Sequence, residues 1–95
     1  MLQSNEWNIR IKRQVQKDFV ILPSAVRQQI IALLLEIRYQ GPVRGNWKNY
    51  SKLGKDKHHC HIKSGKPTYV CCWQAYPALR NVEVYYVGTH EKAPY

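Results

Sequence analysis

The chain has 95 residues, of which 44% are apolar, and it carries a formal net charge of +9 at pH 7. This length suffices for one compact domain and not for two, so we expect a single domain over residues 1–95. The longest apolar run, residues 30–35, is six residues long, too short for a membrane-spanning helix, which needs roughly 20. The N-terminus also lacks the pattern of a secretory signal, and we therefore expect a cytoplasmic protein with no membrane partner.

The cysteines do not indicate a disulfide framework, because there are three and two of them are adjacent (Cys71 and Cys72). Cys71 alternates with Tyr69 and Trp73, which places it in the core. His58 to His61 and the cysteines are zinc-type ligands, but they form no CxxC or HxxxH pair. We therefore expect no metal, no small-molecule cofactor and no nucleophilic cysteine.

Positive charge is concentrated in one window. Residues 44–66 contain seven cations and one acid, Asp56, and so account for +6 of the net +9. Trp47 and Tyr50 lie among these cations, and clustered cations with aromatic neighbours are typical of nucleic-acid contact surfaces. The alternative is a solvated patch that only aids solubility. The lysines expected to contact phosphates are Lys48, Lys52, Lys55, Lys57, Lys63 and Lys66.

The first half of the chain predicts a strand followed by two helices. Residues 7–11 alternate apolar and polar, which indicates a strand. Val15, Phe19 and Leu22 then recur at helical spacing, up to Pro23. Ser24 is the expected N-cap of a second helix, which Gly41-Pro42 ends. Its apolar stripe is Val26, Ile30, Leu33, Leu34 and Ile37, and we interpret it as core.

The second half predicts a loop over residues 40–56 and then three strands, at 57–63, 68–73 and 82–87. Residues 64–67 form a hairpin-length connection, residues 75–81 a second turn, and Gly88 releases a tail. The order predicts an α+β fold: a small, largely antiparallel sheet with both helices packed on one of its faces.

The strand at 57–63 carries the most informative chemistry. Strict alternation places His59, His61 and Lys63 on one face and Cys60 and Ile62 on the other. Imidazoles carry protons near neutral pH, because their ordinary pKa is about 6.5. A face of imidazoles and ammonium groups suits a polyanionic ligand. The alternative is a basic outer strand with incidental histidines.

These elements together resemble RelE-type toxins of the RelE/ParE superfamily, which belong to bacterial type II toxin–antitoxin systems. The resemblance rests on the order of elements, the segment 17–28, the Val87-Gly88 strand end and the cationic strand. It covers nearly the whole chain. It implies a ribonuclease fold that cleaves mRNA, usually in the ribosomal A site, and a cognate antitoxin that blocks it.

The resemblance also implies site residues. His59 and His61 occupy the positions of two RelE lysines, His90 that of an arginine, and Tyr95 that of a tail tyrosine. Thr68 replaces a further arginine, unless Lys66 on the turn supplies that cation. The superfamily relatives HigB and YafQ look similar in using histidines for this work.

RNA cleavage by a 2′-hydroxyl needs a base, an acid and cations, and it needs no metal. We expect His61 and His90 to be the proton-transfer pair, with His59 as a second candidate or a phosphate contact. Which histidine is acid and which is base stays open. Lys63 and Lys66 would stabilise the anion, and Tyr95 would stack on a base or orient the nucleophile. The alternatives are a non-catalytic inhibitor of DNA gyrase, as in the ParE branch, and a basic nucleic-acid-binding module.

Overall fold

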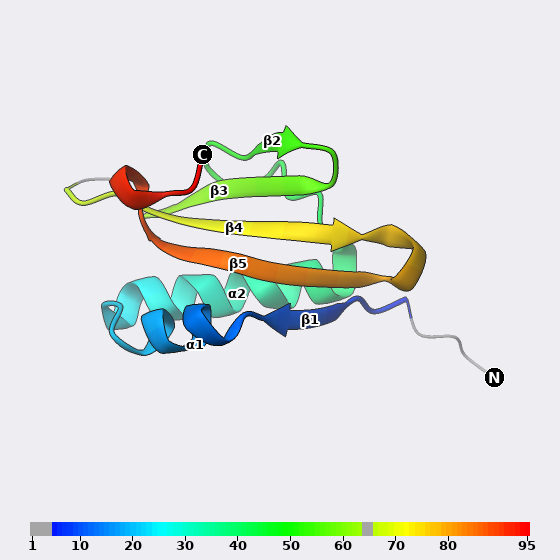
Figure 1. Ribbon diagram of the computed structural model, residues 1–95, viewed down its shortest axis with the longest axis horizontal. Helices are drawn as coiled ribbons and strands as arrows, with labels where there is room; N and C mark the ends of the chain where they lie inside the picture. Colours follow the sequence, from blue (N-terminus) through cyan, green and yellow to red (C-terminus); the bar gives the residue numbers. More distant parts are fainter. Residues whose placement is uncertain (1–4, 64–65) are drawn as a thin grey trace.

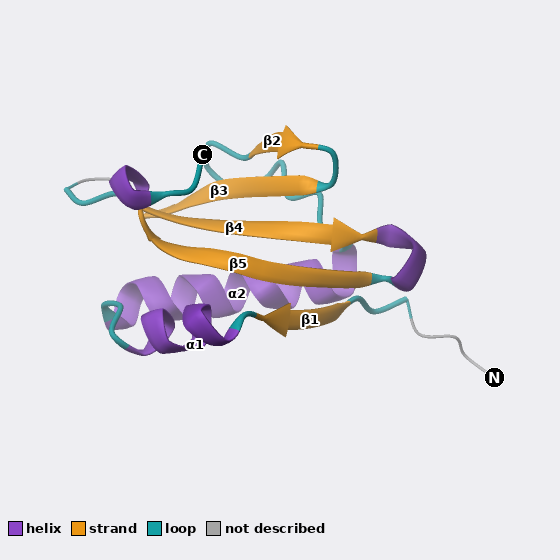
Figure 2. Cartoon of the chain, viewed as in Figure 1, coloured by secondary structure: helices purple, strands orange, loops and turns teal. Residues whose placement is uncertain are grey.

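One mixed sheet of five strands forms the framework of the protein in the computed structural model, which describes residues 5–63 and 66–95 (Figures 1 and 2). The strands are β1 (Asn8–Ile11), β2 (Ser51–Gly54), β3 (Lys57–Lys63), β4 (Tyr69–Tyr76) and β5 (Asn81–Thr89), in the spatial order β1-β5-β4-β3-β2. β1 pairs with β5 in parallel, and the other pairs are antiparallel. This arrangement places β3, the histidine-bearing strand, between β2 and β4.

The helices α1 (Arg13–Val20) and α2 (Ser24–Gln40) lie against one face of this sheet (Figure 1). The buried residues of α2 are Val26, Ile30, Leu33 and Ile37, four of the five positions of the predicted apolar stripe. They pack in one hydrophobic cluster with Val15 of α1 and with alternate residues of the sheet. The predicted α+β architecture, with both helices on one face, is confirmed.

Several predicted boundaries differ from the structure. The predicted loop 40–56 contains the edge strand β2, which is short and polar and lacks an apolar alternation that would have revealed it. β4 continues to Tyr76, and a 3-10 turn, η1 (Pro77–Leu79), then reverses the chain. β5 runs through Gly88 to Thr89 before a second 3-10 turn, η2 (His90–Lys92). The predicted connection 64–67 lies partly outside the described residues.

The cap of α2 was also predicted at the wrong residue. Pro23 occupies the N-cap position without a side-chain hydrogen bond, and Ser24 is the first helical residue. Proline suits this place because its fixed φ leads into the helix. Arg27 donates hydrogen bonds to the carbonyl oxygens of Val20 and Leu22 instead, which ties the end of α1 to the start of α2.

None of the helices in the described part of the chain has both the length and the apolar character that crossing a membrane would require.

Candidate functional site

The alternation predicted for β3 holds from His58 to Ile62. Cys60 and Ile62 are buried in the core cluster between sheet and helices. His59 and His61 therefore project from the opposite face. His61 remains partly exposed, but His59 is only 8% exposed. The predicted open face is thus partly covered at His59.

His58 shares the core-facing side of the strand and is 2% exposed. Its ring stacks on Trp73 with centroids 5.7 Å apart and an interplanar angle of 7°. The Tyr50 hydroxyl lies 2.6 Å from its Nδ1. Burial, and secondarily the charge of Lys52, lowers its pKa below the ordinary 6.5. His58 is therefore a neutral, hydrogen-bonded core residue.

On the other face, three histidines and one tyrosine form a group that we call the imidazole cluster: His59, His61, His90 and Tyr95. The ring centroids of His59 and His61 are 6.1 Å apart, and those of His61 and His90 are 5.4 Å apart. The ring centroid of Tyr95 lies 4.7 Å from that of His59 and 6.0 Å from that of His90. The fold thus brings together all four residues that the sequence proposed as catalytic, from β3, η2 and the C-terminal tail.

Contacts at the end of β5 hold His90 in the cluster. Its backbone N–H donates to the Thr68 carbonyl at 2.8 Å. The Tyr86 hydroxyl crosses Gly88 to donate to the Thr89 carbonyl at 2.6 Å. A Cβ added to Gly88 would lie 2.7 Å from that hydroxyl, so a side chain at this position would displace the contact. Glycine is therefore required for the chain path that leads into η2.

The ring nitrogens of the two β3 histidines are contacted by the segment preceding β3. Asn49 Nδ2 lies 3.1 Å from His61 Nδ1. His59 Nδ1 lies 3.1 Å from the Ser51 hydroxyl and 3.3 Å from the Ser51 carbonyl oxygen. Burial is the main cause that lowers the pKa of both imidazoles, and the charge of His90 lowers both further. Both rings are consequently neutral near pH 7.

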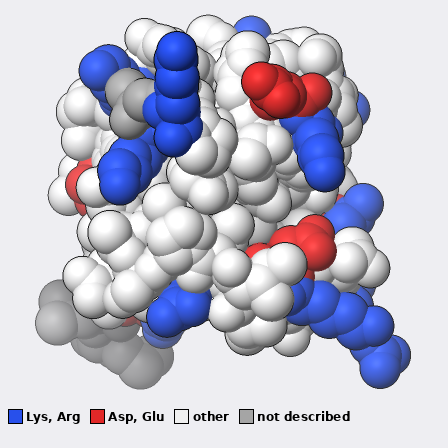
Figure 3. All heavy atoms as spheres, turned by 90° about the vertical axis from the view of Figure 1, so that its left-hand side faces the viewer, with Lys and Arg blue, Asp and Glu red and all other residues white. Residues whose placement is uncertain are grey.

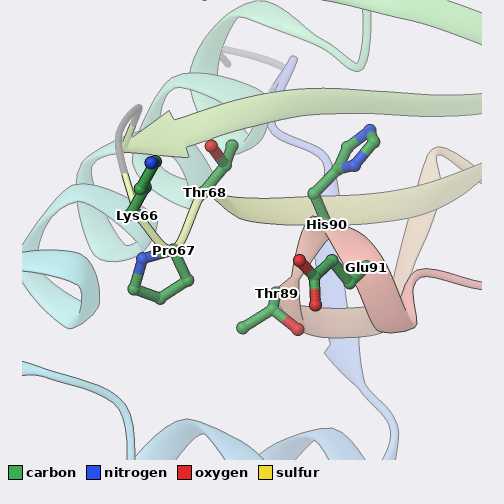
Figure 4. Close-up of a pocket in the computed structure, with 6 residues that line it drawn as sticks. All are labelled: Lys66, Pro67, Thr68, Thr89, His90 and Glu91. Atoms are coloured by element: carbon green, nitrogen blue, oxygen red, sulfur yellow. The ribbon is translucent and has the colours of Figure 1, made fainter.

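A pocket of about 430 Å³ opens beside His90, and its lining comes from the segment that precedes β4, the last residue of β5 and the start of η2 (Figure 4). The residues that line it are Lys66, Pro67, Thr68, Thr89, His90 and Glu91. In Figure 4 the imidazole of His90 points toward β3, on the same side as the side chains of Lys66 and Thr68. The pocket therefore offers one cation, one imidazole and one carboxylate at the edge of the cluster.

The six lysines predicted to contact phosphates are all exposed, but they do not form one patch. Lys48 and Lys66 lie beside the cluster, because the charge of Lys48 acts on His61 and Lys66 lines the pocket of His90. Lys52 lies opposite His58 in the pairing of β2 with β3. Figure 3 looks onto the end of the molecule where β3 meets β4, and Lys and Arg side chains project there around a largely uncharged centre.

The remaining three lysines are distributed along the length of β3. Lys55 lies in the turn before the strand and Lys57 at its start, where its ammonium group is 6.0 Å from the Tyr85 ring centroid. Lys63 lies six residues further, roughly 20 Å away at 3.3 Å per residue. The pairing register shifts between His61 and Lys63, so the alternation that would align Lys63 with the histidines is interrupted.

The loop before β2 is fixed to α2 by Glu36. One oxygen of this carboxylate accepts hydrogen bonds from Arg44 at 3.0 Å, Asn46 at 2.9 Å and Trp47 at 3.0 Å. The pKa of Glu36 is lowered, chiefly by the hydrogen bond from Asn46. The backbone N–H of His61 then donates to the Lys48 carbonyl at 2.8 Å. Through this loop, α2 positions the segment that contacts the imidazoles.

The three cysteines are buried and carry free thiols. Cys71 belongs to the core cluster, with Tyr69 packed against that cluster, as predicted. Burial raises the pKa of Cys60 and of Cys72 to about 12, and it raises the pKa of Cys71 well above its ordinary value. Such thiols are poor nucleophiles. Within residues 5–63 and 66–95, the histidine, cysteine and acidic side chains form no group of three suited to hold a metal ion.

Solved structures of RelE toxins share this architecture. A mutant of the E. coli toxin RelE in the free state is 21% identical, with 93% of this chain and 87% of that chain covered and a TM-score of 0.71. The RelE of an archaeal RelE–RelB complex from Pyrococcus horikoshii is 13% identical, with 93% and 99% covered and a TM-score of 0.69. The chain has the RelE fold.

More distant structural similarity extends to the toxin–antitoxin complex RelBE2 from Mycobacterium tuberculosis, which is 16% identical, with 90% of this chain and 92% of that chain covered and a TM-score of 0.53. No family model matches the sequence. No curated protein matches it either.

On this RelE fold, the positions inferred from the family resemblance converge in the imidazole cluster, and their roles stay predictions. Thr68, at the position of a family arginine, contributes its carbonyl to His90. Lys66 lines the same pocket.

Sequence reasoning missed Asn49 and Ser51, which contact the rings of His61 and His59. The turn signal Gly54-Lys55-Asp56 between two short segments would have indicated the β2–β3 hairpin.

Proposed function

We propose that this chain is the toxin of a type II toxin–antitoxin system and an endoribonuclease that cleaves mRNA at the cytoplasmic ribosome. The RelE fold, which extends over 93% of the chain, supports the toxin class. The observation that carries the nuclease proposal is the imidazole cluster, in which His61 and His90 lie 5.4 Å apart beside Tyr95. A surface that only binds gains little from titratable rings grouped in this way.

The cluster contains the groups that cleavage by a 2′-hydroxyl requires. A neutral imidazole takes the proton of the attacking hydroxyl, and a second ring protonates the departing 5′-oxygen. Lys48 and Lys66 lie beside the rings and stabilise the charge that develops on phosphorus. Lys66 thereby supplies the cation that Thr68 does not. Imidazoles and ammonium groups perform every step, so the reaction proceeds without a divalent metal.

Purified protein incubated with ribosomes and mRNA tests this proposal. We expect cleavage that persists in EDTA and leaves 2′,3′-cyclic phosphate or 3′-phosphate ends. The variant with Gln at positions 59, 61 and 90 is the matched negative control, because it keeps polar side chains that neither take up nor release a proton near neutral pH. Cleavage that stops in EDTA and returns with Mg²⁺ would contradict the metal-independent mechanism.

Expression in cells distinguishes the alternative functions. We expect growth arrest and, by primer extension, new 5′ ends within coding regions. Intact transcripts with gyrase-dependent DNA breaks would identify a ParE-like inhibitor instead. RNA binding without cleavage would identify a nucleic-acid-binding module.

The same proposal includes a cognate antitoxin. A domain with a net charge of +9 attracts an acidic partner and associates with it quickly. We expect an acidic or amphipathic segment to cover the imidazole cluster or displace the tail that carries Tyr95. Amide hydrogen exchange should be measured for this protein in a complex with the product of the neighbouring gene. It should show protection of β3 and the tail. Protection confined to α1 and α2 would place the partner elsewhere.

A further inference from the structure

The hydrogen-bond partners of His59 and His61 differ in a way that bears on catalysis. A neutral imidazole carries one proton, and the partner of one ring nitrogen decides which nitrogen holds it. In both rings Nδ1 is contacted by the segment that precedes β3, so Nε2 is the nitrogen left for a substrate. The chemistry of the Nδ1 partner therefore sets what each ring presents at Nε2.

His59 faces the backbone carbonyl of Ser51, which only accepts. The Ser51 carbonyl oxygen, 3.3 Å from Nδ1, has no proton to give, and the Ser51 hydroxyl at 3.1 Å can accept as well. The proton of the neutral ring consequently lies on Nδ1. Nε2 of His59 then carries a lone pair, which is the form a general base requires.

His61 faces a partner that donates. Asn49 directs its amide Nδ2, 3.1 Å away, at Nδ1. Nδ1 accepts this hydrogen bond with its lone pair, so the proton of the neutral ring lies on Nε2. The backbone supports this geometry, since Asn49 has a φ of 52°, a left-handed conformation that asparagine adopts more readily than most residues.

We propose, on the basis of the proposed ribonuclease function, that Asn49 and the Ser51 carbonyl assign different roles to the two rings. His59 Nε2 removes the proton of the 2′-hydroxyl as the new O2′–P bond forms. His61 Nε2–H donates a hydrogen bond to a phosphate oxygen, because a neutral imidazole gives up its second proton too reluctantly to act as the acid. The P–O5′ bond breaks, and the imidazolium form of His90 protonates O5′.

This division departs from the sequence-based expectation that His61 and His90 are the pair that transfers protons to and from the RNA. Asn49 is a positioning residue in this scheme. It acts through His61.

Long-range proton–nitrogen NMR spectra of the folded, ¹⁵N-histidine-labelled protein test the assignment directly. At a pH about one unit above the ordinary imidazole pKa of about 6.5, we expect a proton on Nδ1 of His59 and on Nε2 of His61. Asn49→Asp replaces the donor with a carboxylate that only accepts and should move the His61 proton to Nδ1. Ser51→Ala keeps the carbonyl and should leave the His59 spectrum unchanged.

Two further variants separate a structural effect from the tautomer effect. Asn49→Gly tolerates the positive φ and removes the partner, so the His61 ring should show both neutral tautomers. Asn5→Asp makes the same chemical change as Asn49→Asp at an exposed position and should alter neither ring. A proton on Nδ1 of His61 in the unsubstituted protein, or no change in Asn49→Asp, would overturn the assignment.

Cleavage assays add the functional readout. Asn49→Asp should lower the cleavage rate about 10²-fold, the loss expected when one donor to the developing charge is removed, while Asn5→Asp should cleave normally. If the unsubstituted protein cleaves no RNA but the spectra agree, the ribonuclease proposal is wrong and the tautomer assignment stands. If it cleaves RNA but the spectra disagree, only the division of roles is wrong.

Discussion

At the scale of single residues, His58 and His90 occupy opposite environments. His58 is 2% exposed and stacked on Trp73, whereas His90 is exposed on η2. Protonating His58 would place a charge in the core, and burial accordingly lowers its pKa. In the unfolded chain this ring would titrate near 6.5. The unfolded state therefore binds more protons than the native state in the range below this value.

This difference predicts a dependence of stability on pH. The free energy of unfolding should be highest above about pH 6.5 and should fall as the pH drops below that value, by at most about 1.4 kcal/mol per pH unit for one ring. Urea denaturation at several pH values measures this slope. His58→Gln should be less stable overall but should show a smaller slope. An unchanged slope would assign the effect to His59 and His61, whose pKa values are also lowered.

For His90 we predict a loss of activity without a loss of stability. His90→Gln should lower cleavage about 10²–10⁴-fold, the usual range for a lost general acid or base. Its free energy of unfolding should change by less than about 0.5 kcal/mol, because the side chain is exposed. Single-turnover cleavage and urea denaturation measure the two effects. If His90→Gln cleaves normally while Tyr95→Phe does not cleave, the acid is the tyrosine.

At the scale of elements, the attachment of the loop before β2 to α2 depends on Glu36. Glu36→Ala removes an acceptor that three donors share. Among them is the largely buried Arg44, whose side chain keeps only its hydrogen bond to Gln40 and whose Nε has no hydrogen-bond partner in the described structure. We expect a loss of about 1–3 kcal/mol in the free energy of unfolding. Glu83→Ala is the matched control, because its pair with the exposed Arg10 spans 3.8 Å and should contribute less than about 1 kcal/mol.

Glu36→Ala should also change the environment of the imidazole cluster. The released loop carries Asn49, so the ring spectrum of His61 should change in this variant and stay unchanged in Glu83→Ala. Equal destabilisation by both substitutions would show that the hydrogen bonds of Glu36 do not hold the loop.

The sequence predicted most of these elements because their patterns are local. The stripe from Val26 to Ile37 repeats at helical spacing, and the alternation around His59 and Cys60 follows the strand period. Ser51–Gly54 escaped prediction because an edge strand of four largely polar residues has no buried face to reveal it. Its existence depends on pairing with β3, which is a tertiary contact.

The candidate site divides in the same way. His59, His61, His90 and Tyr95 could be proposed from strand alternation and family resemblance. The burial of His59 could not, because it arises from segments distant in sequence, including Tyr95, whose ring lies 4.7 Å away. The partners of the ring nitrogens could not be predicted either, since they depend on the register between β2 and β3.

At the scale of the whole molecule, the separation of the lysines predicts an uneven effect on RNA binding. Replacing Lys48 and Lys66 by Gln should lower the slope of log K against log salt by about 1.4, given about 0.7 per single-stranded phosphate contact. Lys12→Gln with Lys17→Gln makes the same charge change on the α1 side and should leave the slope unchanged. Fluorescence anisotropy over a salt series measures both. Equal slopes in the two double variants would mean that only net charge matters.

Replacing Lys55 and Lys57 then indicates the path of the RNA. These lysines precede and begin β3, roughly 20 Å from Lys63. A smaller salt slope in this double variant would show that the bound strand follows β3. An unchanged slope would confine the RNA to the end near His90.

The burial of all three cysteines makes the native protein unreactive toward thiol reagents. Cys60, Cys71 and Cys72 are each 0% exposed, and their thiols stay protonated at neutral pH. We expect no rapid reaction with Ellman's reagent in buffer, and we expect three thiols to react in urea. The rate of labelling under native conditions therefore measures how often the sheet opens. A fast-reacting thiol in the native state would contradict this. Because these thiols do not react, a single introduced cysteine such as Glu91→Cys would be the only rapidly labelled position. A dye attached there would report RNA or partner binding beside His90.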